Sequence, residues 1–560
     1  MRRLFFLIVS ICLVLFSCHE GRDVPPSEKP VIVEIPEEMN DVVSSKIQSA
    51  ISFATNNEGK VNDSLSVKFP ELSLAFYSSD KYKPVWSDNE TKNVLSDSLI
   101  SFINQSMYFG LFPDNYYRNR LNAISERLSR DSLAIRDANM WMRFELLCTD
   151  AFFHLLKDLK EGRMVADSLS IVHKKNYIDS FFVQNLNTAL GRHDITPVME
   201  SAEPTYFKYM DLRNSLRDFV DQMDTTRYQH IRFPFSDSLS FVKSVYARML
   251  QEGIGDKETE IPDSMTFAKD ISRFQKKHGL KADGKIGKLT VEMMNRNDMD
   301  KFLRAAITLD KFKKLQNFPE TYVLVNIPAF SLQVWDHDSL LLTSKVIVGK
   351  PTTPTPELVS QINNLVIYPN WTIPESIIRK DILPELKKDP GYLKKKGYNL
   401  YTQKGDMVDP YTVNWSKYKT NIPWKVVQGS GDDNALGVFK FNFSNPYSVY
   451  LHDTNQRYLF ANSDRALSHG CVRVQQWRQL ADIIASRDSS LYTSGMLNYS
   501  KDSINTWVAN GTRKSIMVKN RFPLYILYLT CDTKDGKIHF YDDIYGVDQR
   551  LAGTYFKNEI

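Results

Sequence analysis

Two reactive side chains stand close together in the C-terminal half of the chain. His452 lies in the segment Val449–Thr454, and Cys471 lies in the segment Ser468–Val474. A thiol is a weak nucleophile near its ordinary pKa of about 8.5, and an adjacent imidazole can take its proton. The first segment ends a predicted strand, and the second follows after a loop. The pair predicts acyl transfer through a cysteine nucleophile.

The neighbours of Cys471 suit the same chemistry. Gly470 lets the backbone come close to a substrate carbonyl, and the amides around Gly470 and Cys471 are candidate donors to the developing oxyanion. Arg473 adds a positive charge that favours the thiolate and can bind a substrate carboxylate.

This spacing resembles the YkuD-type L,D-transpeptidase family. Its mark is a histidine, about fifteen intervening residues, and then Ser or Thr, His, Gly, Cys, any residue, and Arg or Asn. His452 and the run Ser468–Arg473 match every marked position. The order of segments also resembles the large YcbB-like periplasmic members, which combine a helical scaffold, a three-helix peptidoglycan-binding module and a catalytic β-domain with an inserted cap.

The resemblance implies a role for each residue. Cys471 would attack the carbonyl of the meso-diaminopimelate residue in a tetrapeptide stem, expel the terminal D-Ala and leave a thioester. His452 would deprotonate the thiol and later the acceptor amine, and the backbone carbonyl of Asp453 would orient its ring. The product would be a 3-3 cross-link in peptidoglycan, carbapenems would acylate Cys471, and no metal or organic cofactor would be needed. The substrate-binding residues would be Tyr450, Ser468, His469 and Arg473.

Several of these residues also have ordinary structural explanations. Tyr450 alternates with His452 on one strand, so both point to one face, where Tyr450 can serve packing as well as substrate contact. His469 can simply fill space beside the turn, and Arg473 can be an ion-pair partner.

Three other functions remain open. In a zinc-dependent wall hydrolase, His452, His469 and Cys471 would be metal ligands, but no H-E-x-x-H motif accompanies them. A non-catalytic peptidoglycan-binding lipoprotein would keep the fold without turnover, and the unbroken motif argues against it. An L,D-carboxypeptidase would use the same thioester and resolve it with water.

The elements around the motif predict a multidomain α+β protein. Residues 321–530 contain short β-rich runs typical of a sandwich or barrel, and we expect a β-sandwich-like catalytic domain. Between about 375 and 421 the sequence becomes Lys-rich and helix-permissive, which predicts the cap. Strands should resume at Trp424 and Leu436. Residues 301–320 are expected to form a linker helix and residues 531–560 a C-terminal extension.

The preceding part of the chain is predicted to be helical. Residues 37–235 space their apolar side chains by three and four, and Met140–Leu159 is apolar all round, as a helix buried among other helices would be. Cys148 and His154 in this run are expected in the core, and Cys531 is expected to be an inert buried thiol.

A compact helical unit is expected at residues 236–300. Phe274-Gln275, Gly279-Leu280, Asp283-Gly284 and Gly287-x-x-Thr290 resemble, in order, the signature of the small three-helix peptidoglycan-binding module. Gly279 is a plausible helix C-cap, and Asp283-Gly284 makes a turn.

The N-terminus predicts export. Met1-Arg2-Arg3 precedes an apolar run of about 20 Å as a helix, which is too short for a hydrocarbon core of about 30 Å. We therefore expect a signal peptide at residues 1–17. Leu15-Phe16-Ser17-Cys18 resembles a lipobox, which implies lipidation of Cys18 and a tether over residues 18–36. The expected location is the periplasm of a Gram-negative-type envelope, anchored to a membrane through an N-terminal lipid.

Composition fits a folded protein without a nucleic-acid role. The chain has 560 residues, of which 42% are hydrophobic, so most of it can form cores. Its formal net charge is only +5, too small to indicate a nucleic-acid surface.

Overall fold

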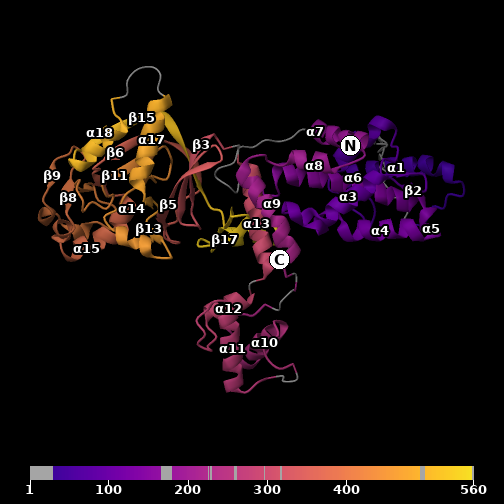
Figure 1. The fold of residues 1–560 in the computed structure, drawn as a ribbon, viewed down its shortest axis with the longest axis horizontal. Helices are drawn as coiled ribbons and strands as arrows, with labels where there is room; N and C mark the ends of the chain where they lie inside the picture. Colours follow the sequence, from indigo (N-terminus) through magenta and orange to yellow (C-terminus); the bar gives the residue numbers. More distant parts are fainter. Residues whose placement is uncertain are drawn as a thin grey trace, which may run out of the picture. The chain divides into compact units, whose positions relative to one another are not determined.

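The chain folds into two compact units. The structure, a computed structural model, describes residues 29–164, 179–224, 226, 230–257, 261–295, 297–315, 318–491 and 498–557. Of these residues, the first unit comprises 29–104, 113–157 and 179–200, and the second comprises 105–112, 158–164 and the described residues from 201 to 557. The expected α+β class, helical in its N-terminal part and β-rich in its catalytic part, is confirmed (Figure 1). The predicted signal peptide and Cys18 lie outside the described residues.

The first unit is helical. Most of α6 (Ala138–Glu161) belongs to it, and this helix is buried along most of its length. Cys148 and His154 lie in the core as predicted, and the imidazole of His154 packs against the rings of Phe69 and Tyr116. The other elements of this unit are α1 (Met39–Asn56), α2 (Pro70–Tyr77), β1 (Ser87–Asp88), β2 (Thr91–Lys92), α3 (Val94–Asn104), α4 (Arg118–Arg130), α5 (Ser132–Ile135), α7 (Asp179–Arg192) and the start of α8 (Thr196–Ala202).

Part of the expected tether is folded onto this unit. The amide of Val31 donates to the Asp137 carboxylate at 2.8 Å, and the amide of Val33 donates to the Arg136 carbonyl at 2.9 Å. The Val33 side chain is buried. A tether reaching to residue 36 is therefore wrong at its C-terminal end, because apolar and backbone contacts already hold residues 31–33.

Three helices in the second unit form the predicted compact module. They are α10 (Ser238–Gln251), α11 (Ser264–Lys277) and α12 (Lys288–Asn295), and they share a core that includes Phe274. The buried Gln275 amide nitrogen donates to Asp283 at 3.0 Å and to Thr290 at 3.2 Å, and its oxygen accepts from the Gly284 amide at 2.9 Å. The motif residues of this segment thus hold one turn together. Their position explains the motif without testing whether the module binds peptidoglycan.

The expected linker helix is a core element. It corresponds to α13 (Asp298–Lys314), which is buried along most of its length. Lys311 of α13 forms a buried ion pair with Asp548, 3.1 Å apart. Around α13 pack α9 (Phe207–Gln222), which the sequence had placed with the scaffold, and the C-terminal extension. That extension contains β16 (Cys531–Lys534), β17 (Lys537–Phe540) and α19 (Val547–Tyr555).

The β-rich C-terminal part is a nine-stranded mixed sheet that closes on itself. Its strand order is β13-β5-β14-β12-β11-β6-β15-β3-β4, and β4 also pairs with β5. Closure is possible because β5 is long: residues 339–345 pair with β4, and residues 346–349 pair with β14 and β13. The strands are β3 (Thr321–Asn326), β4 (Ser331–Asp336), β5 (Ser339–Gly349), β6 (Leu358–Ile367), β11 (Phe439–Phe443), β12 (Leu451–His452), β13 (Ala466–Ser468), β14 (Val472–Val474) and β15 (Lys514–Leu527).

One apolar core fills this sheet. Inward-facing residues include Leu365, Phe441, Leu451 and Val472, all fully buried. Helix α17 (Trp477–Leu491) packs on the sheet beside α18 (Lys501–Ala509) (Figure 1). A β-sandwich-like domain was expected, and in the structure side chains from opposite parts of the closed sheet do pack into one core.

The cap is an independent small layer with its own core. Its sheet has the order β7-β10-β8-β9, from β7 (Trp371–Thr372), β10 (Lys425–Gln428), β8 (Tyr398–Tyr401) and β9 (Met407–Val408). The expected bounds of about 375–421 are too narrow. The strand at Trp424 was wrongly predicted to return to the catalytic sheet: β10 stays in the cap because it pairs with β7 and β8. The cap helices are α14 (Glu375–Ile377), η6 (Ile378–Ile382), α15 (Leu383–Lys388) and α16 (Tyr392–Lys395).

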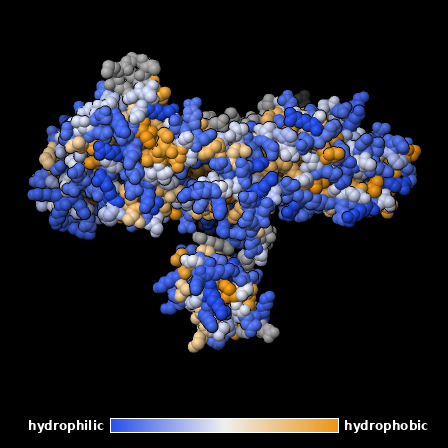
Figure 2. Space-filling model, in the orientation of Figure 1, coloured by the Kyte–Doolittle hydropathy of each residue, from blue (hydrophilic) through white to orange (hydrophobic). Residues whose placement is uncertain are grey.

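On the face seen in Figure 2, hydrophobic residues lie in small groups among hydrophilic ones. Within the described ranges, no helix has both the length and the apolar character needed to cross a membrane.

Candidate active site

The predicted site lies on one face of three adjacent strands. β12 pairs in parallel with β14, so that His452 stands opposite Arg473. β11 pairs with β12 from the other side, so that Lys440 stands opposite His452. Because adjacent strands lie about 4.8 Å apart, Arg473, His452 and Lys440 form a row across the sheet. Leu451 and Val472 alternate with them and point into the core.

A second row contains the thiol. Tyr450 lies two residues before His452, and Cys471 lies two residues before Arg473. The register of β12 and β14 therefore places Tyr450 beside Cys471, on the same face as His452. The amide of Val472 donates to the Tyr450 carbonyl at 3.1 Å, which continues this parallel ladder up to the nucleophile. The structure therefore brings together Tyr450, His452, Cys471 and Arg473, which the sequence had separated by a loop.

The imidazole of His452 is held in one tautomer. Its Nδ1 lies within hydrogen-bonding distance of the Asp453 carbonyl, which can only accept, so Nδ1 carries the proton. In a neutral ring this leaves Nε2 as a proton acceptor. The backbone role expected for Asp453 matches this arrangement. The Asp453 carboxylate is itself fixed, because it accepts from Arg457 at 2.5 Å and from the Val438 amide at 3.0 Å.

Burial keeps this imidazole neutral. Desolvation, followed by the charges of Arg473 and Lys440, lowers the pKa of His452 from 6.5 to about 3, although the bond to Asp453 opposes this shift. Two cations in the same row make an imidazolium unfavourable. His452 is therefore an unprotonated base throughout the neutral range.

The thiol of Cys471 is also neutral at rest. Burial raises the pKa of Cys471, while hydrogen bonds from the Tyr450 amide and hydroxyl and the charges of Lys440 and Arg473 lower it. The side chain remains partly exposed, and its sulfur lies 3.9 Å from the Ser448 carbonyl. The other described thiols differ: Cys148 and Cys531 are fully buried, and burial raises the pKa of Cys531 to about 12.

A tight turn presents Cys471. Gly470 has φ +118°, a conformation that residues with a Cβ rarely adopt. Its amide donates to the Ser468 hydroxyl at 3.0 Å, and its carbonyl accepts from the Thr355 hydroxyl at 2.8 Å. The Ser468 hydroxyl in turn donates to the Cys471 carbonyl at 2.6 Å.

These bonds correct two expectations. The Gly470 amide is committed to Ser468, so it is not an oxyanion donor here. Ser468 is buried with its hydroxyl used inside the turn, so it positions Cys471 instead of binding substrate. Among the described residues no acceptor takes the Cys471 amide, which leaves that amide and the Tyr450 hydroxyl as candidate donors to an oxyanion.

Substitution of Gly470 by alanine should disable the site with a limited loss of stability. The Cβ meets only the Pro354 and Thr353 carbonyls, 3.7 and 3.9 Å away, so strain at the positive φ dominates. We expect about 1–3 kcal/mol of destabilisation and a much larger proportional loss of Cys471 acylation, because the turn shifts. Urea unfolding and acylation rates measure the two effects. Gly553→Ala, in α19 with no atom near its Cβ, is the control and should lose neither.

The remaining predicted residues lie at the edge of the site. The His469 imidazole contacts Asp381 of the cap helix η6, with 3.0 Å between Nε2 and the carboxylate. Arg473 donates to the Gln456 amide oxygen at 3.0 Å. His469 thus faces the cap instead of merely filling space beside the turn, and Arg473 has a neutral partner instead of the ion pair considered above.

Lys440 is the residue that sequence reasoning missed. Its Nζ lies 3.9 Å from the centre of the Tyr450 ring. Burial lowers the pKa of Lys440, and the proximity of Cys471 opposes this. The available signal was a lysine alternating with Phe439 and Phe441 in a buried strand, which places it on the face opposite the core.

The arrangement does not suit the zinc alternative. His469 turns toward Asp381, and His452 is buried with Nδ1 on a carbonyl. Across the described part of the chain, no three His, Cys, Asp or Glu side chains are grouped so that they could hold a metal ion.

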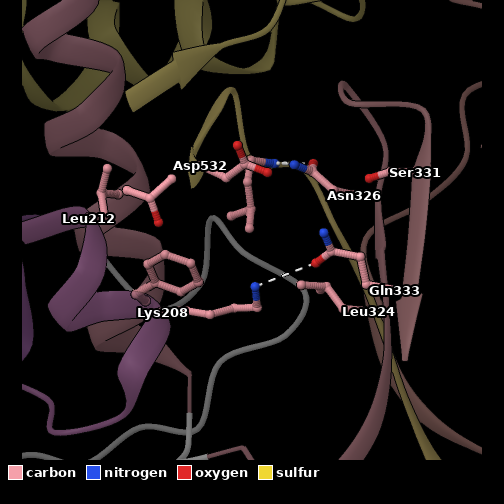
Figure 3. A pocket seen from close by; sticks show the side chains of 10 residues that line it. Lys208, Leu212, Leu324, Asn326, Ser331, Gln333 and Asp532 are labelled. Carbon is pink, nitrogen blue, oxygen red and sulfur yellow. Dashed lines mark hydrogen bonds between the residues drawn. The ribbon is translucent and has the colours of Figure 1, made fainter. Parts of the chain in front are cut away.

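A second recess lies away from this site, between α9, β3, β4 and β16 (Figure 3). There Lys208 Nζ donates to Gln333 at 3.4 Å and lies 4.0 Å from the Trp335 ring centre. Burial lowers the pKa of Lys208 to about 8. None of the predicted site residues lines this recess, and its lining contains no cysteine or histidine.

Comparison with known proteins finds matches to two domains of this chain. The family profile described as the L,D-transpeptidase catalytic domain matches residues 320–508, and the profile described as the Scaffold domain matches residues 72–216. A Haemophilus influenzae protein described as a candidate L,D-transpeptidase is 36% identical over 241 residues, which cover 43% of this chain and 47% of that protein. The match thus spans about half the length of this curated relative.

Solved structures resemble the chain only loosely. An L,D-transpeptidase from Mycobacterium smegmatis gives a TM-score of 0.17 at 14% identity, covering 37% of this chain and 58% of that one. An L,D-transpeptidase from Stackebrandtia nassauensis gives 0.15 at 15% identity, covering 51% and 90%. A likeness this weak adds nothing to the domain assignment.

The domain that carries the cysteine motif and the nine-stranded sheet is thus a YkuD domain. Residues 320–508 form an L,D-transpeptidase catalytic domain, and residues 72–216 form a Scaffold domain in the same chain.

Proposed function

We propose that this protein is an L,D-transpeptidase that forms 3-3 cross-links in peptidoglycan through a thioester on Cys471. The observation that carries the proposal is the placement of Cys471 on the same face as His452, whose Nδ1 is held by the Asp453 carbonyl, so that Nε2 is the unprotonated nitrogen of the neutral ring. The matching catalytic-domain profile and the Haemophilus influenzae relative support the same class of activity.

In the first half-reaction, Cys471 acylates itself. As Sγ attacks the third-residue carbonyl of a tetrapeptide stem, its proton passes to His452 Nε2. The new C–S bond forms, and the carbonyl oxygen becomes an oxyanion facing the Cys471 amide and the Tyr450 hydroxyl. The C–N bond to D-Ala then breaks, and the imidazolium returns its proton to the leaving amine.

In the second half-reaction, an acceptor amine resolves the thioester. The amine of a second stem attacks the thioester carbonyl and gives a proton to His452. The C–S bond breaks, and the thiolate takes that proton back. Because the resting thiol and imidazole are both neutral, His452 acts as a general base during attack and not as a preformed imidazolium partner.

Incubation of the full chain with purified tetrapeptide muropeptides tests this function. Mass spectrometry should find stem dimers, free D-Ala and a thioester on the peptide that contains Cys471. Carbapenem labelling followed by peptide mapping should mark the same peptide. Binding to sacculi without any of these products would favour a non-catalytic wall-binding lipoprotein, and activity lost to chelators but not to thiol alkylation would favour a metal hydrolase.

The cap supports cross-linking over hydrolysis. The contact between Asp381 and His469 joins the cap to the loop that presents Cys471, so the cap can cover the thioester and limit water. A carboxypeptidase would instead need water to reach the thioester. Deletion of residues 381–411 would also remove β8 and most of the cap's apolar core, so single substitutions test the cap more cleanly.

Asp381→Asn should shift the product ratio toward hydrolysis. It removes the carboxylate partner of His469 and loosens the cap, and we expect about a two- to fivefold rise in the ratio of tripeptide to dimer. Product analysis with limiting acceptor gives this ratio. Asp389→Asn, at an exposed acid elsewhere in the cap, is the matched control. An unchanged ratio in Asp381→Asn would contradict the covering role.

Export and wall attachment complete the proposal. The N-terminal sequence supports lipidation at Cys18 and location in the periplasm, and the three-helix module supports retention on peptidoglycan. Globomycin-sensitive processing and palmitate labelling of the expressed chain, lost in Cys18→Ala, would test the anchor.

A further inference from the structure

Lys440 is placed where it can contact a substrate. It stands in the same row as His452, on a strand adjacent to β12 and on the face that carries Cys471. Its side chain leans toward the Tyr450 ring, which belongs to the row of the nucleophile. A peptide whose carbonyl lies against Cys471 therefore passes within reach of this ammonium.

The Lys440 ammonium lacks an anionic partner. No Asp or Glu in the described part of the chain forms an ion pair or hydrogen bond with it. The ammonium lies instead over the face of the neutral Tyr450 ring. Partial burial makes such a charge costly, which the lowered pKa of Lys440 reflects. A cation–π contact compensates only in part, by about 0.5–2 kcal/mol.

The other cation of the row is arranged differently. Arg473 already donates to Gln456 from one terminal nitrogen, and its Nε is buried without a hydrogen-bond partner among the described residues, out of reach of an incoming anion. Lys440, by contrast, is half-buried on a flexible stem, and its ammonium contacts the Tyr450 ring and no acceptor among the described residues, so an incoming anion can pair with it without displacing a protein group.

We propose that Lys440 is a substrate-binding residue whose ammonium pairs with a free carboxylate of the donor stem close to the carbonyl that Cys471 attacks. This inference rests on the proposed function. Two carboxylates of a tetrapeptide stem belong to the residues that flank the reacting bond: the terminal carboxylate of the leaving D-Ala and the side-chain carboxylate of diaminopimelate. If Lys440 pairs with either carboxylate, the enzyme favours stems in which that carboxylate is free over stems in which it is amidated.

Binding to an inactive protein tests the pairing without any turnover. In the Cys471→Ala background, calorimetry measures three synthetic tetrapeptide stems: the free acid, the D-Ala carboxamide and the diaminopimelate side-chain carboxamide. We expect one of the amides to bind about 10- to 100-fold more weakly than the acid, as for a lost charge-assisted hydrogen bond. Which amide binds weakly identifies the carboxylate.

Lys440→Met should remove that preference. This variant keeps the apolar part of the side chain over Tyr450 but removes the charge. The affinity for the free-acid stem should therefore fall to that for the weakly binding carboxamide stem, and the affinity for that carboxamide should not change. Lys440→Arg should retain most of the preference. Lys514→Met is the matched control, because Lys514 is an exposed strand lysine whose Nζ lies 5.4 Å from the Trp507 ring centre.

The outcomes separate the two proposals. Equal binding of acid and amides before substitution, or a preference that survives in Lys440→Met, would overturn the role of Lys440. So would an equal slowing of all three stems in turnover by Lys440→Met with unchanged binding, since that result assigns Lys440 to thiolate stabilisation. Absence of any Cys471 thioester in the unmodified protein would instead overturn the proposed function, while leaving the binding measurement valid.

Discussion

Cys471→Ser should reduce D-Ala release and dimer formation by roughly a thousandfold or more. A serine hydroxyl is far less acidic than a thiol, and the neutral His452 is a weak base, so the pair cannot generate an alkoxide at a useful rate. The turn should be unaffected, because the backbone bonds of Gly470 and the Cys471 carbonyl do not involve sulfur. Muropeptide analysis by mass spectrometry measures this loss.

The control for this substitution is a second thiol in the same unit. Cys531→Ala removes a buried sulfur that contacts Thr308, 3.3 Å away, and it should retain nearly full turnover despite a small loss of stability. Carbapenem adducts should likewise map to Cys471 in this variant. If Cys471→Ser kept substantial cross-linking, the thioester mechanism would be wrong.

His452→Asn should lower the rate of Cys471 acylation by roughly a hundredfold or more. The asparagine amide can still donate to the Asp453 carbonyl, which preserves the local structure while removing the proton acceptor. Single-turnover acylation by a carbapenem measures the effect directly. His539→Gln changes an exposed histidine on β17 and should acylate at the unmodified rate. An equal effect from both substitutions would contradict a specific role for His452.

The pH dependence follows from the direction of the two shifts. Because the pKa of His452 is lowered to about 3 and that of Cys471 is raised, both groups keep their resting protonation across the neutral range. Acylation by general-base attack should therefore vary little between about pH 5 and about pH 8. A preformed thiolate–imidazolium pair would instead give a rate that rises and falls within this interval.

The same shift also makes folding sensitive to acid. Unfolding frees His452 to bind a proton near pH 6.5, whereas the folded state resists protonation down to about pH 3. The unfolded state therefore binds more protons in this window, and stability falls with falling pH by up to about 1.4 kcal/mol per unit. Chemical unfolding at several pH values should show a shallower slope for His452→Asn than for the unmodified protein.

Most of the candidate site could be predicted because its reactive residues belong to a short sequence motif. His452 and Cys471 lie in a motif, and alternation along the strand places His452 on the same face as Tyr450. The roles of Ser468 and Gly470 could not be read in the same way. Whether the Gly470 amide is free depends on the side-chain rotamer of Ser468, and the Gly470 carbonyl is held by Thr355, which is distant in the sequence.

The domain layout was predictable to a similar degree. Buried helix α6 and the three-helix module follow from apolar spacing and turn residues within short segments. The assignments of α9, α13 and β10 required the structure, because each is decided by a partner distant in sequence. A strand such as β10 carries the same apolar signal whether it pairs with the catalytic sheet or with β7 and β8 of the cap.

By itself, the sequence determined the reactive groups, their spacing and the class of reaction they can perform. Only the tertiary structure decided their electrostatics. The pairing of β11 with β12 sets Lys440 against His452, and the burial of His452 and of Cys471 keeps both the base and the thiol neutral. The physical reason is that a pKa and an unpaired charge depend on neighbours across strands, which local sequence does not specify.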